Sequence, residues 1–340
     1  AHGDEVVGEG WHRRAGEPHA EVYALRAAGA LARGATVYTT LEPCAHQGRT
    51  PPCADALVAA GVARVVAACG DPNPETNGDG VRRLREAGIA AEAGLRLDAA
   101  RELNRGFFSR FERGRPWVRI KLAMSLDGRT ALADGESKWI SGEAARADVQ
   151  RWRARSSAIL TGAGTARADD PRLTVRLEQT HPHPSPSLEG EGVKPLRVVL
   201  DTRLDALQPG ANLLDGSAPT LVLHAPGARP RDDRYARVDR AALEPDTAGR
   251  LGLGAALTLL AGRGINELQV EAGATLCGAL FERGLVDELL VYIAPVLLGD
   301  SARPLLQLPS LTEMTSRWQL RTVDRRMLGS DWRLLLRPAR

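Results

Sequence analysis

The chain has 340 residues, more than one hydrophobic core usually supports, so we expect two globular units. Apolar residues make up 43% of the sequence and charged residues 26%, a balance that excludes an intrinsically disordered protein. The 45 basic and 42 acidic side chains are interspersed and leave a net charge of only +3, which argues against a surface built for nucleic acid.

The chain starts at Ala1 without a methionine, and residues 5–11 resemble a strand that is already under way. We therefore expect the natural N-terminus to be missing. No apolar run reaches the roughly 18 residues of a membrane span, and no signal peptide opens the sequence. Two of the four cysteines lie close together, so we expect a cytoplasmic protein that uses thiols as metal ligands and has no membrane partner.

Short apolar strands alternate with alanine-rich helices from Val6 to about Leu97, which predicts a sheet flanked by helices. The helices are expected to begin near His19, Ala54 and Gly80, and the strands to cover residues 36–40 and 62–68. Residues 104–116 are aromatic and basic and end in Gly-Arg-Pro, which predicts a hinge. We place the boundary near residue 114, which gives domains at residues 1–114 and 115–340.

A second alternating series follows and predicts a second α/β unit. Helices are expected from Glu143, over about residues 250–262 and from Ala274. Strands are expected at residues 117–125, 158–161, 196–201, 220–223, 267–271 and 288–295, and near Trp318 and Trp332. Residues 178–194 are of low complexity and cannot pack into a core, so we expect an exposed loop there.

The first unit contains residue types suited to a catalytic zinc site. His19 and Glu21 open a predicted helix, and Cys44 and Cys53 follow further along. One imidazole and two thiolates leave zinc a fourth position for water, which the metal makes reactive near neutral pH. Glu21 can then transfer the proton of that water. Two other interpretations stay open: a structural zinc site, or buried free thiols behind a helix-capping His-Ala-Glu segment.

The same segments resemble the deaminase half of the bifunctional deaminase-reductases of riboflavin biosynthesis. The resemblance is carried by His-Ala-Glu at residues 19–21 and by Thr-Leu-Glu-Pro-Cys-Ala-His-Gln-Gly-Arg-Thr-Pro-Pro-Cys at residues 40–53. It implies an α/β, cytidine-deaminase-like three-layer domain, here lacking its first helix and strand. The implied reaction is hydrolytic deamination of 2,5-diamino-6-(5-phosphoribosylamino)pyrimidin-4(3H)-one.

Within that resemblance, His19, Cys44 and Cys53 are the implied Zn²⁺ ligands and Glu21 is the implied proton carrier. The implied substrate contacts are His12, His46, Arg49 and Asp71. Taken one at a time, these four are better explained by loop polarity, capping or a turn than by substrate binding.

Two strand ends in the second unit carry small residues where a phosphorylated cofactor can approach the backbone. Residues 158–161 run into Gly-Ala-Gly-Thr, and residues 268–271 run into Ala-Gly-Ala-Thr before a predicted helix. Neither segment matches the full Gly-x-Gly-x-x-Gly pattern, so each alone is typical of a tight turn. A third segment, residues 125–131, contains an Asp-Gly turn.

Together with residues 121–128, 135–141 and 168–176, these segments resemble the reductase half of the same family. The resemblance implies a dihydrofolate-reductase-like domain that uses NADPH to reduce 5-amino-6-(5-phosphoribosylamino)uracil to its ribitylamino product. The implied NADPH contacts are Ala123, Trp139, Thr165, Asp169, Thr202, Gly273, Ala274, Thr275, Leu276, Cys277, Gly278 and Ala279. The implied substrate contacts are Ser137, Arg153, Leu173, Arg176 and Glu271, and a homodimer through this domain is also implied.

Physical chemistry supports some of these roles independently, because arginines such as Arg153 and Arg176 bind phosphate by forked hydrogen bonds and Trp139 can cover a flat ring. The leading hypothesis is therefore a bifunctional enzyme that deaminates and then reduces a pyrimidine intermediate. An alternative is a reductase whose truncated zinc domain is inactive. A third hypothesis, editing or binding of nucleic acid, needs a basic, aromatic-lined channel that the charge balance does not support.

Overall fold

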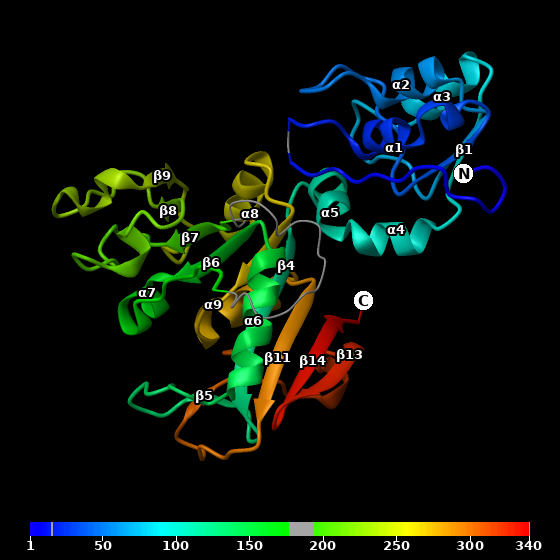
Figure 1. Cartoon of the computed structure of the whole chain (residues 1–340). Helices are drawn as coiled ribbons and strands as arrows, with labels where there is room; N and C mark the ends of the chain where they lie inside the picture. The colour runs from blue at the N-terminus through cyan, green and yellow to red at the C-terminus, as the bar shows by residue number, and fades with distance from the viewer. Residues whose placement is uncertain (15, 177–193, 340) are drawn as a thin grey trace. The chain divides into compact units, whose positions relative to one another are not determined.

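The computed structural model describes residues 1–14, 16–176 and 194–339, so the loop expected at residues 178–194 lies outside the described residues except for Lys194. Contacts among the described residues divide the chain into two units, Ala1–Arg113 and the described residues from Gly114 onward. Each unit has its own sheet and its own core (Figure 1).

The first unit is built on a parallel sheet of β1 (Thr36–Thr39), β2 (Arg64–Ala67) and β3 (Ala90–Ala93), in that order. The connections are α2 (Cys53–Ala60) and α3 (Asp79–Glu86), and α1 (Ala20–Ala28) precedes β1. Leu57 of α2 and Leu84 of α3 are fully buried with Val65 of β2. The sequence therefore placed these helices and strands correctly to within one or two residues at most ends.

Two further helices, α4 (Leu97–Leu103) and α5 (Arg105–Arg113), close the first unit. Phe108 of α5 is buried with Ala100 and Cys69 in a second small core. The prediction of a hinge over residues 104–116 was wrong for most of its length. The aromatic side chains there pack within a helix, Phe107 edge-on to Phe111 with ring centroids 4.9 Å apart. Only Asn104 and residues 114–116 lie between elements.

The strand expected at residues 5–11 is absent from the described structure, where this segment has no regular secondary structure beyond an isolated bridge from His2 to Glu5. The physical reason is its packing against α1. A side chain on Gly8 would lie 2.5 Å from the Ala24 carbonyl oxygen, and one on Gly10 would lie 2.5 Å from the Ala20 carbonyl oxygen. The segment therefore lies directly on the backbone of a helix instead of pairing with a strand.

The second unit contains a nine-stranded sheet in the order β13-β14-β11-β4-β10-β6-β7-β8-β9. The strands from β11 to β9 in that order are parallel, and β14 runs antiparallel to both of its neighbours, β11 and β13. Their bounds are β4 Trp117–Ser125, β6 Ala158–Gly162, β7 Leu196–Leu200, β8 Thr220–His224, β9 Asp239–Ala242, β10 Glu267–Val270, β11 Glu288–Ala294, β13 Leu320–Leu328 and β14 Asp331–Pro338. A short pair, β5 (Arg129–Ala131) with β12 (Arg303–Pro304), lies apart from this sheet.

Helices cover both faces of the large sheet. The largest core includes α8 (Leu253–Gly262) and α9 (Ala274–Glu282) on one face. The other face carries α6 (Glu143–Arg155), drawn across the sheet in Figure 1, and α7 (Ala163–Asp169). In β6 the side chains alternate between these faces, because Ala158 and Leu160 join the first core and Ile159 joins the second.

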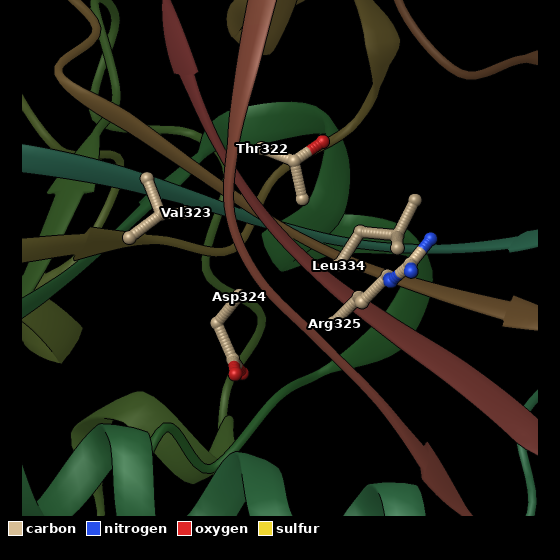
Figure 2. Close-up of a pocket in the computed structure, with 5 residues that line it drawn as sticks. All are labelled: Thr322, Val323, Asp324, Arg325 and Leu334. Atoms are coloured by element: carbon tan, nitrogen blue, oxygen red, sulfur yellow. The ribbon is translucent and has the colours of Figure 1, made fainter.

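Four short 3₁₀ turns complete the described elements: η1 Gly29–Ala32, η2 Asn212–Leu214, η3 Asp233–Arg237 and η4 Met314–Ser316. Within the described ranges, no helix combines the length and the apolar character needed to cross a membrane. A shallow cavity of about 590 Å³ lies on the β13–β14 hairpin, lined by Thr322, Val323, Asp324, Arg325 and Leu334 (Figure 2).

Candidate active sites

Three side chains of types that can bind a metal converge in the first unit. His19 immediately precedes α1, Cys44 follows β1 in a loop, and Cys53 is the first residue of α2. The Nδ1 atom of His19 lies 3.2 Å from Cys53 Sγ and 3.5 Å from Cys44 Sγ. All three ligand atoms lie within 4.8 Å of one another. The chain therefore brings together one nitrogen and two sulfur ligands at a single point.

The chemistry of these ligands fits zinc. A hydrogen bond from Cys53 lowers the pKa of the Cys44 thiol to about 5, and the backbone N–H of Cys53 also donates to Cys44 Sγ at 3.3 Å. The same pairing raises the pKa of Cys53. Cys44 is therefore ready to act as a thiolate at neutral pH, and a metal ion supplies the charge that ionises its partner. A set of one imidazole and two thiolates leaves zinc an open fourth position.

Glu21 lies in the first turn of α1, two residues after His19. Its carboxylate is among the groups that raise the pKa of Cys53, through its charge and a hydrogen bond. The carboxylate therefore lies beside the three ligands without being needed to complete them. This is the position expected of a group that accepts and donates protons next to a metal.

The other residues expected in this site differ in their contacts and in their exposure to solvent. His12 stands edge-on to His19, with ring centroids 5.3 Å apart. His46 contacts Thr76 Oγ1 through Nδ1 at 3.1 Å. Asp71 is buried, and this burial raises the pKa of its carboxyl group. The charge of Glu42 raises this pKa further, and the charge of His46 lowers it. Arg49 is exposed in the loop between the two cysteines.

Glu42 is a residue of this region that the sequence analysis did not identify. It is buried, and its Oε2 accepts hydrogen bonds from the backbone N–H groups of Asp71 at 3.3 Å and Gly78 at 3.0 Å. Its Oε1 accepts a third, from Val81 at 2.9 Å. Glu42 thus holds the loop that carries Asp71. The only sequence signal was an acidic residue two positions before Cys44, which does not reveal burial.

In the second unit, Arg153 and Glu271 form a forked ion pair that is largely shielded from solvent, with side chains 10% and 12% exposed. Arg153 Nε donates to Glu271 Oε1 at 2.7 Å and Nη2 donates to Oε2 at 2.8 Å. Gln269 Nε2 donates to Oε1 at 2.8 Å, and the remaining nitrogen of Arg153 donates to the Thr174 carbonyl oxygen at 3.0 Å. These bonds hold the end of β10 against α6.

Further positive charge surrounds this pair. Burial lowers the pKa of Lys121 on β4, while the neighbouring Glu271 raises it and Arg153 lowers it. Burial also lowers the pKa of Arg176, and Arg153 and Arg172 lower it further. One carboxylate therefore faces several cations, which favours binding of an anionic group such as a phosphate. Lys121 was not identified from sequence, although it is one of only three lysines and interrupts an apolar strand.

The two glycine-containing loops of the second unit meet at the carboxyl edge of the parallel strands. The backbone N–H of Gly273, at the start of α9, donates to Thr165 Oγ1 on α7 at 3.1 Å. A side chain on Gly164 would meet no atom within 4 Å, so this loop borders open space. Small residues, open space and two helix N-termini at neighbouring strand ends fit a dinucleotide such as NADPH.

The other residues expected to contact NADPH or the substrate differ in exposure. Trp139 is 72% exposed, with the Arg146 guanidinium 4.7 Å from its ring centroid, and Asp169 is exposed at the end of α7. Ala123, Ser137 and Thr202 are partly buried, and Leu173 is buried. Within α9, Cys277 and Gly278 face the protein interior, and a side chain on Gly278 would lie 2.1 Å from the Gln307 carbonyl oxygen.

Two family models match the chain. Residues 116–334 match the RibD C-terminal domain. Residues 1–69 match the cytidine and deoxycytidylate deaminase zinc-binding region. The second of these includes His19, Cys44 and Cys53.

Curated relatives resemble nearly the whole chain. The riboflavin biosynthesis protein RibD of Escherichia coli is 48% identical over 334 residues, covering 96% of this chain and 88% of that protein. RibD of Haemophilus influenzae is 46% identical over 344 residues, covering 98% of this chain and 88% of that protein.

Solved structures give the same result for both units. RibD of Acinetobacter baumannii matches with a TM-score of 0.89 and 44% identity, over 99% of this chain and 90% of that one. A diaminohydroxyphosphoribosylaminopyrimidine deaminase/5-amino-6-(5-phosphoribosylamino)uracil reductase of Thermotoga maritima matches with a TM-score of 0.82 and 29% identity, over 98% and 88%. Similarity thus extends over both the cluster of His19, Cys44 and Cys53 and the Arg153–Glu271 pair.

Proposed function

The chain belongs to the RibD family, the bifunctional deaminase-reductases of riboflavin biosynthesis, and on this premise we propose which of its residues perform the two reactions. It is a hydrolase with a zinc-binding deaminase domain and an oxidoreductase that uses NADPH. We assign the deaminase to residues 1–114 and the reductase to residues 115–340.

In the deaminase, His19, Cys44 and Cys53 hold zinc, and the convergence of their ligand atoms within 4.8 Å is the observation that carries the proposal. Bound zinc supplies the Lewis acidity that lets water react near neutral pH. Glu21 takes the proton of the attacking water and returns it to the departing amine of 2,5-diamino-6-(5-phosphoribosylamino)pyrimidin-4(3H)-one. Ammonia is the second product.

We assign four further residues to binding of this substrate. His12 and His46 offer ring nitrogens, Asp71 offers a carboxyl group, and Arg49 offers a guanidinium to the phosphate. Their support is proximity: His12 packs against a metal ligand, and Asp71 lies within electrostatic reach of His46 and Cys44. Glu42 positions the Asp71 loop through its three hydrogen bonds.

In the reductase, NADPH supplies the hydride when it is bound. The assigned NADPH contacts are Ala123, Trp139, Thr165, Asp169, Thr202, Gly273, Ala274, Thr275, Leu276, Cys277, Gly278 and Ala279. The buried residues Cys277 and Gly278 can serve only through their backbone or their packing. Positioning of the two reactants accounts for most of such catalysis, so no obligate acid is assigned.

The reductase substrate, 5-amino-6-(5-phosphoribosylamino)uracil, is assigned to Ser137, Arg153, Leu173, Arg176 and Glu271. The two hydrogen bonds to Glu271 fix the orientation of Arg153. Arg176 lies near Arg153 and adds a second cation that can attract a phosphate. Deamination precedes reduction, because this substrate is the product of the first reaction.

Separate assays of the two steps test these assignments. The full chain, loaded with zinc, is given the diamino substrate and ammonia release is measured, and NADPH oxidation is followed with the deaminated substrate. We expect Glu21→Gln to lower deaminase turnover by at least about a hundredfold, because it removes the proton carrier. Reductase turnover and zinc content should stay unchanged.

Full deaminase turnover in that variant would refute the role of Glu21. No ammonia release from the unmodified, zinc-loaded chain would instead favour the alternative of a reductase with an inactive zinc domain.

We also propose a homodimer through the reductase domain, with small-molecule substrates as the other partners. Four exposed apolar side chains on the β13–β14 hairpin support this surface, namely Leu320, Val323, Met327 and Trp332. Because β13 is the outermost strand of the sheet, a second copy can cover it. The use of two thiols as metal ligands favours a reducing compartment, and we propose the cytoplasm.

A further inference from the structure

Two arginines and one carboxylate bring together neighbouring loops at the carboxyl edge of the large sheet. Arg167 lies on α7, which follows β6, and Arg203 lies just after β7. Both guanidinium groups bond Asp205: Arg203 Nε donates to Oδ2 at 3.2 Å, and Arg167 Nη2 donates to Oδ1. Their positive charges outweigh the effect of burial and lower the pKa of Asp205. The cluster keeps one net positive charge.

The backbone beneath this cluster is anchored. The buried carboxylate of Asp201 accepts hydrogen bonds from the backbone N–H groups of Asp205 at 3.2 Å and Ala206 at 2.9 Å. The hydroxyl of Tyr235 donates to the same carboxylate at 2.7 Å. The loop that carries Arg203 and Asp205 is therefore fixed from the protein interior, while their side chains face solvent.

The position of the cluster relates it to the cofactor. Arg167 lies on α7 between Thr165 and Asp169, and Arg203 directly follows Thr202. Thr165, Asp169 and Thr202 are all assigned to NADPH binding. NADPH differs from NADH by one phosphate on the 2′ oxygen of the adenosine ribose. A phosphate there is a dianion or nearly so, and arginine binds such groups by charge-assisted hydrogen bonds.

We propose that Arg167 and Arg203 bind the 2′-phosphate of NADPH and thereby select NADPH over NADH. The inference rests on the proposed assignment of Thr165, Asp169 and Thr202 to the cofactor. Asp205 holds the two guanidinium groups near each other in the free protein. Exposed ion pairs contribute little to stability, so either arginine can exchange its bond to Asp205 for one to a bound phosphate at small cost in folding free energy.

The chain offers a matched control at the opposite edge of the sheet. Arg263, at the end of α8, pairs with Asp239 at the start of β9, with 3.6 Å between the charged atoms. Its side chain is 39% exposed, the same as that of Arg167. Loss of its charge therefore tests for a general effect of removing a surface arginine from this unit.

The test compares Arg203→Gln, Arg167→Gln and Arg263→Gln in the full chain. Binding of NADPH, NADH and adenosine 2′,5′-bisphosphate is measured by isothermal titration calorimetry. We expect either cluster variant to weaken binding of NADPH and of the bisphosphate by at least about tenfold, because a charge-assisted hydrogen bond is lost. Binding of NADH should stay within about twofold in every variant, and Arg263→Gln should bind all three probes as the unmodified chain does.

An unchanged ratio of NADPH to NADH affinity in both cluster variants would overturn the proposal, as would equal losses for the two nucleotides. A loss of NADPH affinity in Arg263→Gln as large as that in the Arg167 and Arg203 variants would overturn it as well. These outcomes differ from failure of the proposed function, in which the unmodified chain would bind neither nucleotide. Because Arg203 is 75% exposed, its variant should fold normally and keeps the test decisive.

Discussion

At Glu271, burial opposes ionisation, but the charge and hydrogen bonds of Arg153 outweigh it, and Lys121 adds to their effect. Together they lower the pKa of this carboxyl group from its ordinary value of 4.5 to about 2. A carboxyl group with a lowered pKa in the folded state contributes stability above its ordinary pKa, and that contribution is lost as the pH falls toward about 2. The contribution is of the order of 3 kcal/mol.

Replacing Glu271 with glutamine should therefore destabilise the second unit at pH 7 by roughly that amount, since Arg153 loses its partner. The difference between the variant and the unmodified chain should shrink as the pH falls from about 5 to 3. Urea unfolding followed by tryptophan fluorescence measures both, and Glu282→Gln, at an exposed site, provides the control. A difference that stays constant over this pH range would contradict the lowered pKa of Glu271.

The convergence of His19, Cys44 and Cys53 could be predicted at the level of single residues, because histidine and cysteine next to proline at this spacing are uncommon outside metal sites. Glu42 and Lys121 could not. The importance of Glu42 lies in three backbone N–H groups from a segment about 30–40 residues away, those of Asp71 and Gly78 in a loop and that of Val81 in α3. That of Lys121 lies in its burial beside Glu271 and Arg153. Neither property is visible in the types of neighbouring residues along the chain.

At the scale of elements, the close approach of α3 to the loop that carries Cys44 depends on Gly80. A side chain there would lie 1.8 Å from the Pro43 carbonyl oxygen and 3.2 Å from Glu42 Cγ. Because the first contact is with backbone, it cannot be relieved by a rotamer change. Helix α3 or residue Pro43 must move, and Pro43 directly precedes Cys44.

We expect Gly80→Ala to lower the free energy of unfolding of the first unit by about 1–3 kcal/mol and to reduce its zinc content and deaminase turnover. Reductase turnover should be unchanged. Gly254→Ala, in α8, is the control, because a side chain there meets nothing within 4 Å and alanine favours a helix. Calorimetry, zinc analysis and the two activity assays measure these effects. A zinc content equal to that of the unmodified chain would show that the loop absorbs the extra methyl group.

Elements with strong periodicity were predictable, and those whose state depends on a tertiary contact were not. The strands β4, β6 and β8 and the helices α6 and α9 begin where the sequence indicated. Residues 5–11 resemble a strand in sequence, but Gly8 and Gly10 place them against α1. Likewise, residues 104–113 have the charge and aromatic content of a linker, but their aromatic rings pack within α5.

At the scale of the whole molecule, the proposed dimer makes a prediction about the β13–β14 hairpin. Met327 and Trp332 are cross-strand partners, and each is 48% exposed. Met327→Lys should shift the protein from dimer to monomer in light scattering, because it places a charge in an apolar interface. Leu95→Lys, at a 68% exposed position in the first unit, should leave the mass unchanged. A dimeric Met327→Lys variant would place the interface elsewhere, and a monomeric unmodified chain would refute the dimer.

The strand order of the two sheets has a consequence for how the chain folds during synthesis. The strands β1, β2 and β3 are neighbours in sequence and in space, so the first sheet can form as soon as residue 93 has left the ribosome. In the second sheet, β10 lies between β4 and β6, and Arg119 bonds Glu267, 148 residues further along. The strands β4 and β6 therefore lack their shared neighbour until β10 has been synthesised. Such long-range closure is slow, and chaperone dependence should be concentrated in the second unit.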